Sequence, residues 1–177
     1  MVRNMRKILI SLMVPMMALA VTSCVDNVQS NFTPEIRISV PFLSPYYIGD
    51  TLHAKDTLAL HYNESLKMYV TDTIHVGDTL LVGAMFYAYG NNLLSTRVKW
   101  DTTAVRTWFR LNTTILDAMT DTTQISTGYF PFSPNYNMVS FPIYFTPITA
   151  GVHPIEMTVE TDSKYSPRSI SFSLLVR

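Results

Sequence analysis

The chain has 177 residues, an apolar fraction of 47% and a charged fraction of only 15%. Its 13 basic and 13 acidic side chains leave a formal net charge of zero, so no basic excess favours a nucleic-acid partner. This composition excludes a disordered chain and a coiled coil. A single cysteine excludes a disulfide framework and a thiolate zinc cluster. We therefore expect one globular domain, with or without a tail.

The first residues have the pattern of an export signal. An uncharged run over residues 8–21 follows three cations, Arg3, Arg6 and Lys7. A helix of that length reaches about 21 Å, short of the ~30 Å hydrocarbon core of a bilayer. The run therefore predicts a cleaved signal rather than a permanent membrane span.

The apolar run ends in Val21-Thr22-Ser23-Cys24, and Cys24 is the only cysteine. This sequence resembles the lipobox of bacterial lipoproteins, in which an aliphatic residue and two small residues precede an obligatory cysteine. The resemblance implies that residues 1–23 are removed and that the Cys24 thiol receives a diacylglycerol. Further acylation would then anchor the protein to a membrane. The alternative is an ordinary signal cleaved near Ala20, which would leave Cys24 as a free thiol.

Residues 24–45 are predicted to form an extended tether that begins at the lipidated cysteine. Three prolines interrupt this stretch, Pro34, Pro41 and Pro45. An alternation of aliphatic and polar residues over 36–40 indicates one early strand within it. The globular domain is expected over 46–177.

The domain is predicted to be all-β, because apolar and polar residues alternate with a period of two along most of it. The expected strands cover 57–62, 66–70, 79–89, 97–100, 105–111, 138–145, 152–161 and 169–176. We expect Gly90-Asn91-Asn92 to form a turn with positive φ, and Pro142 to mark an edge or a bulge. One short helix is expected over 113–120. Seven to nine strands of this kind favour an antiparallel β-sandwich.

Two stretches resemble bacterial immunoglobulin-like domains. Ile74-His-Val-Gly-Asp-Thr-Leu80 is similar to the opening of their second strand, and 145–159 to the approach to their penultimate strand. The resemblance covers about residues 66–177 and implies an immunoglobulin-like sandwich. His153 stands where such domains have the tyrosine of the tyrosine corner. A fold of this kind implies no particular function.

Asp is followed by Thr, and then by an aliphatic residue or Thr, more often than the composition predicts. The threonines concerned are Thr51, Thr57, Thr73, Thr79, Thr102 and Thr122. The triplet resembles the O-glycosylation signal of exported Bacteroidetes proteins, which implies glycans on these hydroxyls. The alternative is structural. In Val76-Gly-Asp-Thr-Leu80, and in the matching 48–52, Gly would take a positive φ, Asp would cap the turn and Thr would begin a strand.

The sequence contains no Gly-rich phosphate loop, Gly-x-Ser-x-Gly or His-Glu-x-x-His. A zinc site built from His61, His75 and a carboxylate is less expected than separate surface histidines. Glu156 and Glu160 would share one face of a strand, as a glycosidase pair does, but solvated edge charges fit a chain of this size better. We therefore expect no metal, no cofactor and no enzymatic activity.

The strongest candidate for binding is the loop Tyr129-Phe-Pro-Phe-Ser-Pro-Asn-Tyr136. Four aromatic side chains, Tyr129, Phe130, Phe132 and Tyr136, would stack there on sugar rings or on a partner protein. The favoured alternative is that Phe130 and Phe132 close the end of the core.

These patterns predict a lipoprotein of Bacteroidetes type, held to the outer membrane by its N-terminal lipid and carrying a non-catalytic interaction module. The partner class is a protein or a glycan. The alternative function is a glycan-binding accessory lipoprotein of a polysaccharide-uptake system, in which the loop aromatics hold the sugar.

Overall fold

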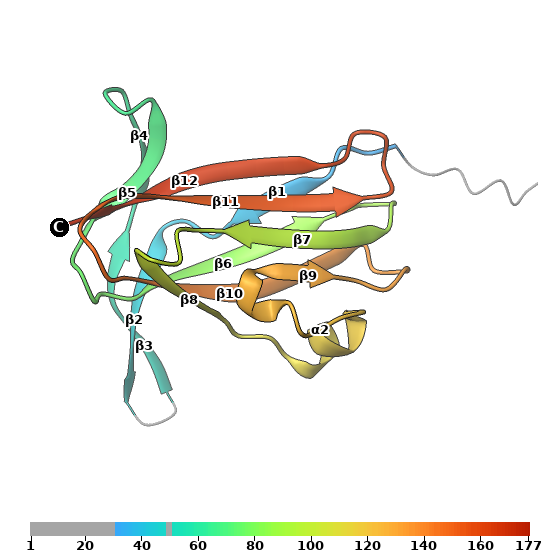
Figure 1. Ribbon diagram of the computed structural model, residues 1–177, viewed down its shortest axis with the longest axis horizontal. Coiled ribbons are helices and arrows are strands. Elements are labelled where there is room, and N and C mark those ends of the chain that lie inside the picture. Colours follow the sequence, from blue (N-terminus) through green and yellow to red (C-terminus); the bar gives the residue numbers. More distant parts are fainter. Residues whose placement is uncertain (1–30, 49–50) are drawn as a thin grey trace, which may run out of the picture.

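The structure is a β-sandwich of two sheets (Figure 1). It is a computed structural model that describes residues 31–48 and 51–177. Within these residues, twelve strands divide equally between the sheets, which we call sheet A and sheet B. The predicted all-β sandwich is confirmed. The early strand expected over 36–40 is present, but the expected number of strands was too low, because the strands at 42–48, 51–58 and 129–131 were not recognised as separate elements.

Sheet A has the strand order β3-β2-β6-β10-β8, and β1 also pairs with β6. Its strands are β1 (Glu35–Ile38), β2 (Phe42–Ile48), β3 (Thr51–Leu58), β6 (Leu80–Tyr87), β8 (Val105–Phe109) and β10 (Met138–Pro147). Sheet B has the order β4-β5-β12-β11-β7-β9. Its strands are β4 (Leu60–Asn63), β5 (Met68–Ile74), β7 (Leu93–Lys99), β9 (Tyr129–Pro131), β11 (Gly151–Thr161) and β12 (Arg168–Val176). A helix, α2 (Thr113–Ala118), and a 3-10 helix, η1 (Ile125–Thr127), connect β8 to β9.

Strand β6 illustrates how the sequence pattern produces the core. Its alternate residues, Leu80, Val82, Ala84 and Phe86, are fully buried between the sheets, while the residues between them are half-exposed. This confirms the predicted two faces of the strand. Full burial of a Leu or Phe side chain stabilises a fold by about 1.5–3 kcal/mol, so the alternation holds β6 in one register.

The segment expected to be a tether contributes two strands to sheet A. Strand β1 pairs with β6, and β2 pairs with β3. The side chains of Ile36 and Phe42 are buried in the core, which is why this stretch folds onto the sandwich. The expected boundary at residue 46 was therefore wrong, since the sandwich already begins at β1. Pro34 precedes β1, and Pro45 lies at a register shift in β2.

Sheet B is mixed rather than purely antiparallel. β11 and β12 form the predicted antiparallel closing pair, with Ile155 opposite Phe172. β12 also pairs with β5, and this pair is parallel, with Ser173 opposite Val70. The hairpin with β4 sets the direction of β5 and the hairpin with β11 sets that of β12, so their relative direction was not visible in either strand alone.

Two of the expected turns have different outcomes. Gly77 has φ +90°, and the Asp78 carboxylate accepts the backbone N–H of His75 at 2.9 Å, as predicted. After β6, however, the residue with positive φ is Tyr89 rather than Gly90. The matching turn at 49–50 lies outside the described residues.

The expected helix is confirmed as α2. The side chain of Asn112 accepts the N–H of Ile115 at 2.9 Å and caps its first turn. Pro142 does not mark an edge strand. It lies in β10, which pairs with β6 on one side and β8 on the other, at the point where the pairing with β8 ends.

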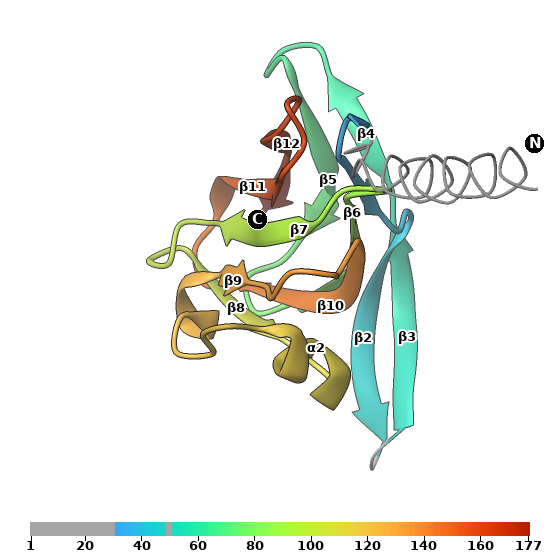
Figure 2. The same cartoon turned by 90° about the vertical axis from the view of Figure 1, so that its right-hand side faces the viewer.

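Two hairpins project from the body of the sandwich. Figures 1 and 2 show the β2–β3 hairpin and the β4–β5 hairpin extending at opposite ends of the molecule. Tyr62 and Tyr69, opposite each other in the β4–β5 hairpin, are exposed and pack edge to face with ring centroids 5.4 Å apart.

Candidate functional site

The predicted aromatic loop does not present four rings to a ligand. Phe130 is 0% exposed and Phe132 only 5%. The Phe130 ring packs against Phe109 and Phe141, each with centroids 4.9 Å apart. These two phenylalanines close the core, which was the alternative interpretation, and they are unavailable as stacking surfaces because their rings are already enclosed.

The two tyrosines of the loop are half-buried and already have neighbours. The Arg97 guanidinium lies over the Tyr129 ring at 4.7 Å from its centroid. Tyr136 lines a cavity of about 260 Å³ between α2 and β10, together with Asn112 and Ser140. The loop therefore does not offer the expected surface of four rings, and binding through Tyr129 or Tyr136 stays a prediction.

The six candidate threonines differ in accessibility. Thr51, Thr57, Thr102 and Thr122 are exposed. Thr73 and Thr79 are half-buried, and the hydroxyl of Thr79 lies 3.0 Å from that of Thr146. Glycosylation at these hydroxyls stays a prediction.

The aspartates of the triplets have structural partners. Wherever these carboxylates are described, each accepts a backbone N–H; they belong to Asp56, Asp72, Asp78, Asp101 and Asp121. The Asp101 carboxylate also accepts the hydroxyl of Thr103 at 2.6 Å, and these bonds lower the pKa of Asp101. The predicted turn cap followed by a strand is found at Asp78, and Asp101 and Asp121 also cap turns, whereas Asp56 and Asp72 lie within β3 and β5.

The histidines and glutamates singled out in the sequence do not converge. The His61 ring nitrogen lies 3.6 Å from Asp72, and that of His75 lies 3.4 Å from Asp78. In the described part of the chain, no group of three His, Cys, Asp or Glu side chains is placed to hold a metal ion. Glu156 pairs with Lys99 at 3.5 Å, whereas Glu160 accepts a hydrogen bond from Ser95.

His153 makes a bond of the kind found in a tyrosine corner. It is buried, and its Nε2 lies 2.8 Å from the carbonyl oxygen of Thr149, four residues upstream. A tyrosine corner likewise joins a side chain to the backbone a few residues before it. His153 therefore has a structural role at the start of β11.

The outer face of sheet A is the candidate functional surface. The residues of β6 that point away from the core include Leu81, Gly83, Met85 and Tyr87. Their cross-strand neighbours on β10 are Tyr144, Pro142, Ser140 and Met138. This face is mostly apolar. The corresponding row on sheet B is polar, since Lys99 is opposite Glu156 and Glu156 is opposite Ser171.

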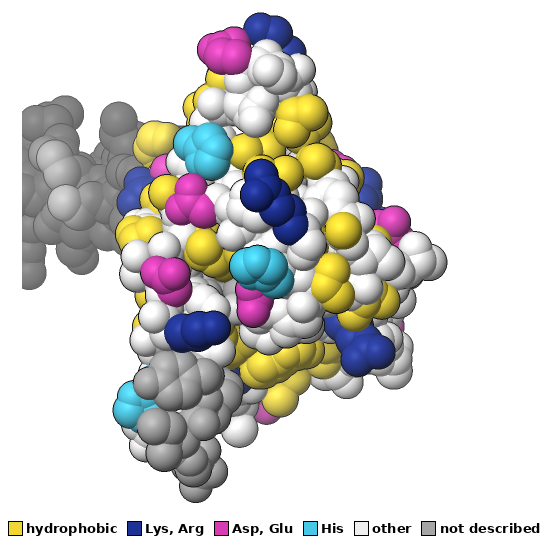
Figure 3. Space-filling model, turned by 90° about the vertical axis from the view of Figure 1, so that its left-hand side faces the viewer, with side chains coloured by type: hydrophobic (Ala, Val, Ile, Leu, Met, Phe, Trp, Pro, Cys, Tyr) yellow, Lys and Arg dark blue, Asp and Glu magenta, His cyan; other side chains and the backbone are white. Residues whose placement is uncertain are grey.

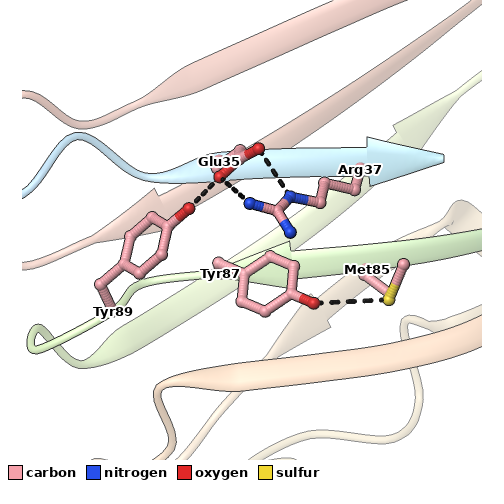
Figure 4. Close-up of polar contacts among 5 residues, drawn as sticks. All are labelled: Glu35, Arg37, Met85, Tyr87 and Tyr89. Carbon is pink, nitrogen blue, oxygen red and sulfur yellow. Dashed lines mark hydrogen bonds and ion pairs between the residues drawn. The ribbon is translucent and has the colours of Figure 1, made fainter.

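One end of this face carries an aromatic and charged cluster, shown in Figure 4. The Arg37 guanidinium donates to both carboxylate oxygens of Glu35, at 2.7 and 3.0 Å. Arg37 also lies over the Tyr87 ring, 5.0 Å from its centroid, and the Tyr89 hydroxyl donates to Glu35. The Tyr87 and Tyr89 rings stack with centroids 5.8 Å apart.

The charges of this cluster neutralise each other. The hydrogen bonds from Arg37 lower the pKa of Glu35, and the same bonds raise the pKa of Arg37. Both groups are exposed, so the pair contributes little to stability. Sequence reasoning missed this cluster, although the i, i+2 spacing of Glu35 and Arg37 places both side chains on one face of β1. Tyr89 joins them from the turn that follows β6.

The other end of the face carries Trp108 on the edge strand β8. Trp108 is directly opposite Tyr144 of β10. Their rings stack almost in parallel, at an interplanar angle of 5° and with centroids 3.5 Å apart. Trp108 is 43% exposed and Tyr144 only 1%, so Trp108 covers Tyr144 and keeps its second ring face towards solvent.

Elsewhere, the surface charge is mixed. Figure 3 shows the side of the molecule on which the C-terminus lies, and hydrophobic, acidic, basic and histidine side chains are interspersed there.

No helix in the described ranges is long and apolar enough to cross a membrane. The expected lipidation site, Cys24, lies outside the described residues.

Comparison with known proteins yields no family. No family model matches the chain, and neither does any curated protein. Among solved structures, a family 123 glycoside hydrolase from Clostridium perfringens is 13% identical, with a TM-score of 0.41. The match covers 82% of this chain but only 27% of that one, so this chain spans about a quarter of the hydrolase.

Two other solved structures show a similarly distant resemblance. A conjugative transposon lipoprotein from Bacteroides eggerthii is 12% identical, with a TM-score of 0.36, and the match covers 77% of this chain and 98% of that one. Domains 4 and 5 of the S-layer protein SbsC are also 12% identical, with a TM-score of 0.35. That match covers 86% of this chain and 74% of the other.

Proposed function

We propose that the protein is a lipid-anchored component of the outer membrane whose β-sandwich acts as a non-catalytic binding module. The observation that carries this proposal is the position of Cys24. The only cysteine of the chain directly follows a basic segment, a short apolar run and two small residues. A diacylglycerol together with a further acyl chain gives stable membrane anchoring, since each buried methylene contributes about 0.8 kcal/mol.

The position of the first strand fits an anchored domain. Only ten residues separate Cys24 from Glu35, the first residue of β1. Fully extended, ten residues span at most ~36 Å. The sandwich would therefore lie close to the membrane surface, with a shorter connection than the sequence alone indicated.

The carboxyl groups with perturbed pKa values do not have the properties of a general acid. Hydrogen bonds lower the pKa values of Glu35, Asp101 and Asp121, and none of the three is buried. A general acid at neutral pH needs a raised carboxyl pKa instead. Each of these carboxylates also has a local structural partner that accounts for its shift.

The anchor is tested with Cys24→Ala, using Ser23→Ala as the matched control because it keeps a small residue before the cysteine. Cells are fed an alkyne analogue of palmitate, and the protein is purified and weighed by mass spectrometry. We expect the natural chain and Ser23→Ala to carry the label and to lack residues 1–23. Cys24→Ala should carry no label. A natural chain without acyl label, or a labelled Cys24→Ala, would refute the anchor.

A further inference from the structure

The edge strand β8 presents a flat aromatic ring between two cations. Val105 is buried and Phe109 packs against the core, so the alternate residues Arg106 and Trp108 point outward from sheet A, and the exposed Arg110 directly follows the strand. Each arginine is two positions from Trp108, about 7 Å along the strand. The order of side chains along the edge is therefore cation, indole, cation.

The Trp108 ring is held in place before any ligand arrives. One of its faces covers Tyr144, and the parallel stacking fixes it flat on the sheet. Arg37, Arg97 and Lys164 lie over tyrosine rings, but within the described ranges no cation lies over Trp108. Its outer face is thus rigid and uncovered, so a ligand can stack on it with little loss of side-chain entropy.

The two arginines have no charge partner of their own. Arg106 and Arg110 are exposed, and neither side chain makes an ion pair or a hydrogen bond with another described residue. This distinguishes them from Arg37, which is held by Glu35. Each guanidinium keeps its forked set of donors free for a carboxylate or a sulfate.

We propose that Arg106, Trp108 and Arg110 form a binding site for an acidic polysaccharide. The apolar face of a sugar ring stacks on the outer face of Trp108. Carboxylate or sulfate groups on neighbouring sugars pair with the two arginines. Because the arginines lie two positions either side of the ring, a chain of sugars engages the complete site better than one sugar. The inference uses the proposed function only in treating the domain as a binding module, and it does not depend on the lipid anchor.

The neighbouring surface can contact further sugars of the polysaccharide. The backbone N–H of Arg110 donates to the carbonyl of Pro142, so the end of β8 runs beside β10. Two residues further on, Asn112 lines the 260 Å³ cavity together with Ser140 and Tyr136. This places hydrogen-bonding groups and an aromatic ring next to the end of the site that carries Arg110.

A sugar suits this site better than a lipid headgroup layer. An aromatic side chain that anchors a protein in a bilayer projects from the surface with its apolar body towards the acyl chains. Trp108 instead lies flat on Tyr144 and offers one open face. That geometry favours stacking with a flat partner over insertion.

The test measures binding by calorimetry with the full-length protein in a nonionic detergent at low salt. The acidic probes are an oligogalacturonate, a hyaluronan fragment and a chondroitin sulfate fragment. Methyl-esterified oligogalacturonate is the neutral counterpart of the first. We expect at least one acidic probe to bind, and the methyl ester to bind more weakly by a factor of about ten or more. Added salt should weaken the binding of the acidic probe, because exposed charges are screened.

Variants assign the binding to this site. We expect Trp108→Ala to weaken it about tenfold. Since this change uncovers Tyr144 and risks destabilising the sheet, the double variant Arg106→Gln/Arg110→Gln is the second test, because both side chains are exposed. The matched control is Arg97→Gln, which removes an exposed arginine beside a tyrosine on sheet B and should leave binding unchanged.

The following results would each overturn the proposal. The first is that none of the acidic probes binds. The second is that the methyl ester binds as well as the acid, or that Arg97→Gln weakens binding as much as the double variant does. The third is equal, Trp108-dependent binding to micelles that contain phosphatidylglycerol, which would identify the site as a lipid contact. The palmitate label on Cys24 has no influence on these results, so the two proposals fail independently.

Discussion

Replacing Phe130 tests whether the aromatic loop belongs to the core. The side chain is fully buried, and its ring contacts Phe109 and Phe141 with centroids 4.9 Å away in both cases. Phe130→Ala removes the ring and leaves a cavity beneath β9. Truncating a buried Phe to Ala costs about 3–5 kcal/mol, from the lost transfer free energy and the unfilled space. We expect the free energy of unfolding to fall by that amount.

The measurement is a urea titration followed by circular dichroism, with Tyr129→Ala as the control. Tyr129 is half-buried and its main contact is with Arg97, so its truncation should cost about 1 kcal/mol or less. In thermal unfolding, Phe130→Ala should lower Tm by about 6–20 °C. If Phe130→Ala does not fold, Phe130→Leu should still fold and lose about 1–2 kcal/mol.

The reasoning fails if the two alanine variants are equally stable. Phe130 would then lie at the surface in solution, and the loop would again qualify as a stacking platform. A large loss for Tyr129→Ala with a small loss for Phe130→Ala would contradict the order of burial directly.

Two further predictions concern a turn and an acidic side chain. Gly128→Ala should destabilise by about 2–4 kcal/mol, because Gly128 has φ +72° and an added Cβ would meet the carbonyl oxygen of Val98 at 2.2 Å. Gly77→Ala is the control, since Gly77 has φ +90° but an added Cβ there would meet no atom within 4 Å. In a urea titration this variant should lose only about 1–2 kcal/mol of unfolding free energy. Hydrogen bonds from Gln124 and Thr123 lower the pKa of Asp121, so its ionised form stabilises the folded state above the ordinary carboxyl pKa. That contribution is lost as the pH falls through the lowered folded-state pKa, so the stability gap between the natural chain and Asp121→Ala should narrow in acid. A gap that widens in acid would contradict this sign.

The site was less predictable than the strands that carry it. The alternation of Arg106, Trp108 and Arg110 is present in the sequence, but its significance depends on Tyr144, which is thirty-six residues away and directly opposite Trp108. The loop at 129–136 was predicted to bind a ligand because exposed aromatic side chains in a loop are unusual. Burial of Phe130 and Phe132 accounts for two of its rings.

The sequence by itself determined the all-β class, the faces of β6, the closing hairpin of β11 and β12, and the short helix α2. These follow from residues close together in the chain, because side-chain periodicity and caps act locally. Only the tertiary structure decided that β1 and β2 join sheet A, that β5 and β12 are parallel, and that Pro142 lies in an inner strand. These features are set by contacts between distant segments, which compete for the same core and leave no local pattern. For the same reason, the outer face of sheet A became visible only when β1, β6, β8 and β10 were placed side by side.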